Sequence, residues 1–183
     1  MFGFGRRKMR KDDEFMRVSY FLDESDDFTR DFSKERLMAA MNWATMQSAF
    51  CVQFCRKNPA TSELNDYQMK FLLIAQLMGV INQVVSEAFK SPSEEIKEAV
   101  LLMAIADKYK ESVNFFGLYI EDAQKIIMQI KDLSDQDWVK ESIKSGELAW
   151  KESQANRDNM MPTADLYDNH DLVKNAKNIE SVV

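Results

Sequence analysis

The chain has 183 residues, a net charge of −6 and a sequence pI near 5.0; 45% of its residues are hydrophobic and 30% are charged. A chain of this length buries roughly 70% of the surface that its unfolded form exposes, and its acidic balance argues against nucleic-acid binding by the body of the protein. With one histidine, two cysteines, five glycines and three prolines, the sequence argues against catalytic triads, histidine-rich metal sites, disulfide frameworks and folds built from many tight turns.

The chain opens with a basic arm over residues 1–11. The arm carries no acidic residue, and its aromatic and basic members are Phe2, Phe4, Arg6, Arg7, Lys8, Arg10 and Lys11. Residues 12–35 reverse the sign, with nine acids against three bases. We expect residues 1–32 to be a largely irregular arm and acidic linker, with Phe28 and Phe32 held against the body. The arm is either a solvated start that folds back on the acids or an anchor for an anionic membrane surface.

The first strong helix is predicted over 33–57. Ser33 is a suitable N-cap, Glu35 lies in the first turn, and Pro59 ends the helical pattern. The nineteen residues from Leu37 to Cys55 carry no charge. Methionine and aromatic side chains crowd this helix, and they either face the core or form an apolar surface for a partner: Met38, Met41, Trp43, Met46, Phe50 and Phe54.

The second helix is predicted over 62–90. Its centre is strongly apolar, but polar residues recur at helical spacing along one line, so the pattern is typical of a buried helix with one polar stripe. We predict a buried helix in preference to a membrane span, which needs ~20 predominantly apolar residues. The stripe suggests a polar cluster in the core made of Gln76, Asn82, Gln83 and Glu87.

The sequence "SPSE" at 91–94 predicts a further helix start, with Ser91 as N-cap, Pro92 at the first helical position and Glu94 completing a capping box. Apolar residues then recur at steps of three or four as far as about Asp132. This pattern fits one long helix over 93–132 or two helices joined near 115–118, and the sequence does not choose between them.

The last strong helix is expected to begin within 134–137, with Ser134 or Asp135 as its cap, and to carry Trp138 and Trp150, with Gly146 as a point where it could break. Beyond about residue 156 the pattern becomes polar, so we expect 157–183 to be a mobile tail with one short helix near 170–180. The predicted fold is all-α: a bundle-like arrangement of four or five helices over 33–156, between mobile N- and C-terminal tails.

Reactive residues offer little chemistry. Cys51 and Cys55 share a helix face, but a metal site would need further ligands, so we interpret them as core residues. His170 lies in the predicted tail. Neighbouring Asp and Glu residues on the predicted helices alternate with lysines at helical spacing, which is typical of a solvent-exposed helix face. We therefore expect no catalytic residues, no metal and no cofactor.

The sequence thus predicts a cytoplasmic, non-enzymatic protein that binds a protein partner or a second copy of itself through a helical face. One alternative is a peripheral membrane protein held by residues 1–11. Another is a small enzyme or ligand-binding bundle with a polar core site. The C-terminal residues 180–183, "ESVV", have the shape of a recognised C-terminal motif, although this pattern is common by chance.

Overall fold

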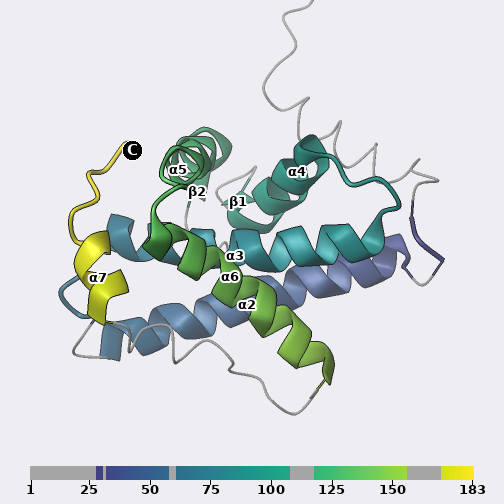
Figure 1. Ribbon diagram of the computed structural model, residues 1–183, viewed down its shortest axis with the longest axis horizontal. Coiled ribbons are helices and arrows are strands. Elements are labelled where there is room, and N and C mark those ends of the chain that lie inside the picture. Colours follow the sequence, from purple (N-terminus) through teal and green to yellow (C-terminus); the bar gives the residue numbers. More distant parts are fainter. Residues whose placement is uncertain (1–27, 31, 58–60, 108–117, 156–169) are drawn as a thin grey trace, which may run out of the picture.

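The computed structural model describes residues 28–30, 32–57, 61–107, 118–155 and 170–183. Six helices occupy most of these residues, which confirms the predicted all-α, bundle-like fold (Figure 1). The helices are α2 (Lys34–Lys57), α3 (Asp66–Ala88), α4 (Glu94–Ile105), α5 (Ile120–Asp132), α6 (Asp137–Ala155) and α7 (His170–Ala176).

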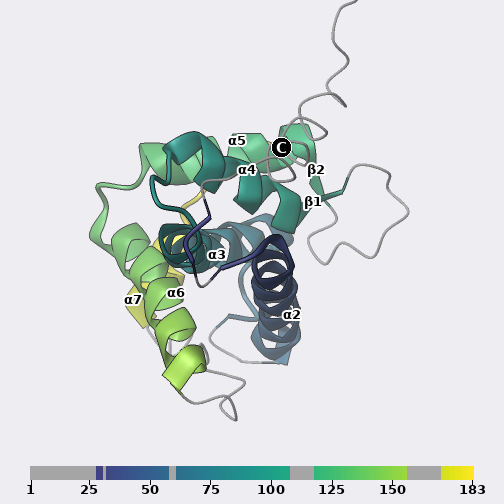
Figure 2. The same cartoon turned by 90° about the vertical axis from the view of Figure 1, so that its right-hand side faces the viewer.

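Helix α3 lies at the centre and contacts each of the other five helices (Figures 1 and 2). It is long and apolar enough to cross a membrane by length and composition, with a mean hydropathy of 1.5 over its most apolar window, yet 78% of that window is buried inside the protein. A helix with neighbours on most sides needs apolar residues around most of its circumference. The predicted burial of this helix is confirmed.

Three helix starts are fixed by side-chain caps. The Ser33 hydroxyl accepts a hydrogen bond from the Arg36 N–H at 3.3 Å, as predicted for α2. Helix α3 begins at Asp66, four residues later than predicted, because Asn65 and Gln68 form a reciprocal capping box. The predicted cap at Ser91 is wrong: the Ser93 hydroxyl accepts from the Ile96 N–H at 3.2 Å, and α4 starts at Glu94.

Within the region 93–132, the described residues form two helices and not one. Helix α4 ends at Ile105, and α5 begins at Ile120. Between them lie two short strands, β1 (Ala106–Asp107) and β2 (Leu118–Tyr119), which pair in parallel with Ala106 opposite Leu118. The helical spacing of apolar residues survives across this interruption because both helices bury one face against α3. Residues 108–117 lie outside the described part.

Gly146 does not break α6. It is buried in the middle of the helix, where α6 crosses α3 beside Gly79. A Cβ atom on Gly79 would lie 1.8 Å from the carbonyl oxygen of Ile143, and one on Gly146 would lie 1.9 Å from the carbonyl oxygen of Gln76. Only glycine allows two backbones to approach this closely. Helix α6 starts at Asp137, within the predicted range 134–137, but neither Ser134 nor Asp135 directly precedes it.

The two ends of the described chain are held against the body. Phe28 stacks on Phe89 with ring centroids 4.7 Å apart, and Phe32 is buried, as the sequence predicted for both. The predicted short helix near 170–180 is α7. In this part of the predicted tail Leu172, Ala176 and Ile179 are buried in the main core.

Candidate functional site

Helix α2 contains the predicted partner-facing residues, and only some of them lie on its outer surface. One face of the helix enters the core through Leu37, Ala40, Met41 and Ala44. Met38 and Met46 lie on the opposite side with 36% and 52% of their surface exposed, and Asn42 between them is exposed as well. The predicted set therefore divides, because Met41 is a core residue while Met38 and Met46 are not.

Trp43 occupies the border between these two faces. Its ring meets the ring of Trp150 from α6 edge-on, with the centroids 5.6 Å apart. The side chains of Phe50 and Phe54 lie outside the described part of the structure, as do those of Cys51 and Cys55.

The predicted polar cluster on α3 is dispersed over several neighbours. Gln76 is buried, and its amide lies 3.5 Å from the hydroxyl of Ser145 on α6. Glu87, at the other end of the helix, is half-buried and accepts hydrogen bonds from the Gln83 amide at 2.8 Å and from the Trp150 indole N–H at 3.0 Å.

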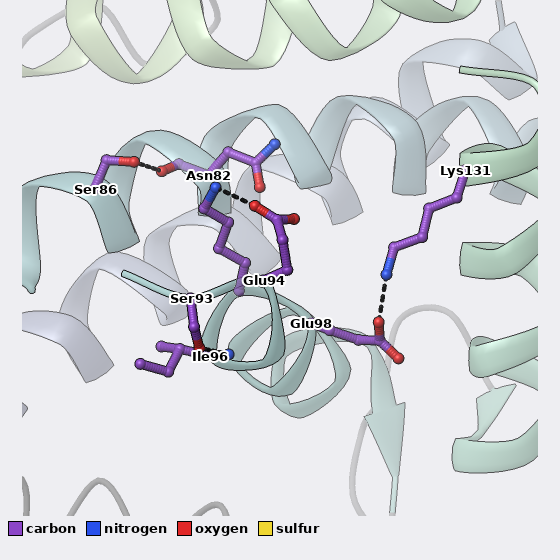
Figure 3. A network of polar contacts seen from close by, with 8 residues as sticks. Asn82, Ser86, Ser93, Glu94, Ile96, Glu98 and Lys131 are labelled. Carbon is purple, nitrogen blue, oxygen red and sulfur yellow. Dashed lines mark hydrogen bonds and ion pairs between the residues drawn. The ribbon is translucent and has the colours of Figure 1, made fainter. Parts of the chain in front are cut away.

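Asn82 points elsewhere, toward α4, where Figure 3 shows it above Glu94 and Glu98. The four residues consequently do not line one polar cavity. The partners Ser145 and Trp150 could not be found from the sequence, since nothing in the spacing pairs them with positions more than 60 residues earlier.

A small hollow lies where α3, α4 and α5 meet. Its volume is about 20 Å³, and its wall combines apolar side chains with Asn82, Glu94, Lys97, Glu98 and Lys131. This space is enough for about one water molecule. Ion pairs surround it: Lys97 contacts Glu94 at 2.6 Å, and Lys131 reaches across from α5 to Glu98 on α4 (Figure 3).

Among the described residues, no group of three or more His, Cys, Asp or Glu side chains lies close enough together to hold a metal ion. His170 is the first residue of α7. The predicted arm residues lie outside the described part: Phe2, Phe4, Arg6, Arg7, Lys8, Arg10 and Lys11.

A second cluster of polar contacts was missed by sequence reasoning. The chain that follows α7 lies against the beginning of α3 and against α5, where Gln68 and Gln129 donate hydrogen bonds to its backbone. Tyr67 belongs to the same cluster, and its partial burial raises the pKa of its phenol above the usual value. Glutamine and tyrosine on a helix carry no sequence signal for such a role.

Comparison with protein-family models, with curated proteins and with solved structures finds no match for this chain.

Proposed function

We propose that the protein is a non-enzymatic interaction protein that associates with a second copy of itself through the outer stripe of α2, defined as Met38, Asn42 and Met46. The observation that supports this proposal is the exposure of two methionines on a helix that has no charged residue from Leu37 to Cys55. A helix face that remains in water normally carries charged side chains, and exposed apolar surface of this kind is typical of a contact surface.

The stripe is self-complementary. Its three residues are spaced four apart, so they follow one another along one side of the helix. If two α2 helices cross antiparallel about a twofold axis at Asn42, Met38 of one copy faces Met46 of the other and the two asparagines meet at the centre. Twofold symmetric contacts are the commonest among soluble oligomers, and a central asparagine pair specifies register in helix pairs.

The distribution of charged residues along α2 also favours the antiparallel dimer. In the antiparallel pair each stripe faces a stretch with no ionised side chain, so no like charges oppose each other. Methionine side chains adapt their shape at such contacts. The hollow between α3, α4 and α5, with room for about one water molecule, offers less support for an enzyme.

The test is the molar mass of the full chain by light scattering and sedimentation velocity over a range of concentrations. We expect the wild-type chain to shift from monomer to dimer as concentration rises. Met46→Glu should weaken self-association at least tenfold, because it places two charges in the contact, while the folding of the monomer changes little at an exposed site.

Met128→Glu is the matched control. Met128 on α5 is 62% exposed, more than Met46, but it lies on a helix with charged neighbours and away from the stripe. It should leave the dimer unchanged. A wild-type chain that stays monomeric at every concentration, or equal weakening by both substitutions, would contradict self-association through α2.

The membrane alternative stays a prediction of the sequence, since residues 1–11 lie outside the described part of the structure. The cytoplasmic location stays a prediction in the same way.

A further inference from the structure

The segment Lys177–Val183 begins with a turn at Lys177 and Asn178 that follows α7, and it is held through its backbone. The Gln68 side-chain amide donates a hydrogen bond to the carbonyl oxygen of Lys177 at 2.8 Å. The Gln129 amide donates to the carbonyl oxygen of Glu180 at 3.0 Å. Side-chain amides that bind backbone carbonyls recognise the path of the chain, here a turn after a helix, whatever side chains it carries.

Two side chains of the segment add selectivity. Ile179 is buried in the core, with 8% of its surface exposed. Lys177 forms an ion pair with Glu63, and this contact lowers the pKa of the Glu63 carboxyl. The remaining residues, Glu180 to Val183, are exposed. The contact thus consists of backbone hydrogen bonds, one apolar anchor and one charge pair, a combination typical of bound peptides.

The side-chain oxygen of each glutamine is held by a group of the body. The side-chain oxygen of Gln68 accepts the Asn65 N–H at 3.0 Å in the capping box of α3, which leaves its NH₂ group for the segment. The side-chain oxygen of Gln129 accepts the Tyr67 hydroxyl at 2.6 Å, with the same result. A site whose donors are fixed before the ligand arrives loses less entropy on binding.

We infer that Glu63, Tyr67, Gln68 and Gln129 form a peptide-binding site, here named the α3–α5 seat, which the chain fills with the segment Lys177–Val183 at the end of α7. The segment is a tethered ligand, joined to the body through α7 and residues 156–169. The chemistry that the seat recognises is a short helical peptide that ends in a turn, with a cationic residue and an aliphatic residue two positions later. This inference does not depend on self-association through α2.

The test uses the full chain and a fluorescein-labelled peptide of residues 170–183, with binding measured by fluorescence anisotropy. In the wild-type chain the tethered segment competes at an effective concentration in the mM range, so the peptide binds weakly. Leu172→Asp combined with Ile179→Asp loosens the tethered segment and leaves the seat intact. We expect this double variant to bind the peptide at least tenfold more tightly than the wild type does.

The seat itself is tested in the same background. Adding Gln129→Ala should remove most of the gained affinity, whereas Gln124→Ala, the same change five residues earlier on α5, should not. A double variant that keeps its far-UV circular dichroism and binds no more peptide than the wild type overturns the inference. A double variant that loses its helical signal also overturns it, because the segment is then an indispensable part of the core.

Discussion

Glu87 connects α3 with α6 and with the segment before α2. Its carboxylate accepts hydrogen bonds from Gln83 on its own helix and from Trp150 on α6, and its backbone carbonyl accepts from the Thr29 hydroxyl at 2.8 Å. Trp150 in turn contacts the ring of Trp43 on α2. A half-buried carboxylate with two side-chain donors remains favourable where an unpaired one would be costly.

Trp150→Phe should therefore destabilise the fold by about 1.5–3 kcal/mol, since it removes a hydrogen bond to a charged group and leaves Glu87 with one donor fewer. The free energy of unfolding is measured by urea titration. Trp138→Phe serves as the control, because the ring of Trp138 lies against Phe71 at 5.8 Å and this aromatic contact survives the substitution. Equal losses in both variants would show that the hydrogen bond to Glu87 contributes nothing.

The raised pKa of Tyr67 predicts how the stability of the protein changes at alkaline pH. Burial raises its pKa in the folded protein, so above the ordinary value of 10.0 the unfolded chain ionises more readily than the folded one. The contribution of Tyr67 to stability is complete below that pH and is lost as the pH rises through the folded pKa. The unfolding free energy of Tyr67→Phe, measured from pH 8 to 11, should fall less steeply than that of the wild type; parallel curves would contradict this.

At the scale of elements, the crossing of α3 and α6 depends on two glycines that no local rule identifies as packing residues. Low helix propensity made Gly146 a candidate break. The tertiary contact reverses that interpretation, because the missing Cβ atoms let the backbone of each helix reach the other at Gly79 and Gly146. Glycine lowers the stability of an isolated helix, but the close packing of α3 against α6 that it allows offsets this loss.

Gly79→Ala and Gly146→Ala should each destabilise the protein by at least ~2 kcal/mol, although alanine is the better helix former, because each new methyl group would overlap a backbone carbonyl. Thermal and urea unfolding measure the loss. Lys144→Ala, at an exposed position of α6, should change stability by less than about 0.5 kcal/mol. A glycine variant as stable as the wild type would mean that the helices separate at little cost.

The break between α4 and α5 belongs to the same scale. Apolar residues recur at helical spacing throughout residues 93–132, so the sequence was compatible with either one helix or two. The spacing of apolar residues shows which face of a helix is buried. Helices α4 and α5 both bury their apolar face against α3. One helix and two helices would both bury the same line of residues, so the spacing alone does not choose between them.

At the scale of the whole molecule, the body is a set of helices around α3, and its surface chemistry is uneven. The outer stripe of α2 is uncharged, while the surfaces of α4, α5 and α6 carry ion pairs such as Lys125 with Asp122 at 3.2 Å. Exposed pairs of this kind contribute little to stability. They do keep those faces in water, which is consistent with the proposed contact through the outer stripe of α2.

The basic arm gives a whole-molecule prediction that comes from the sequence alone. Each basic residue near an anionic membrane surface contributes about 1 kcal/mol, and Phe2 and Phe4 could insert. If the arm is an anchor, the full chain should sediment with vesicles containing anionic lipid, less so at high salt. A chain lacking residues 1–11 should stay in solution, and equal sedimentation of both chains would contradict the anchor.

The sequence by itself determined the all-α class, the burial of α3 and the Ser33 cap, because helical periodicity, hydropathy and capping are local properties of neighbouring residues. Only the tertiary structure decided that Gly146 lies at a helix crossing and that Glu87 meets Trp150. It likewise decided that the segment after α7 binds Gln68 and Gln129. Each of these depends on which residues distant in the chain come within a few ångströms, and no local pattern encodes that distance.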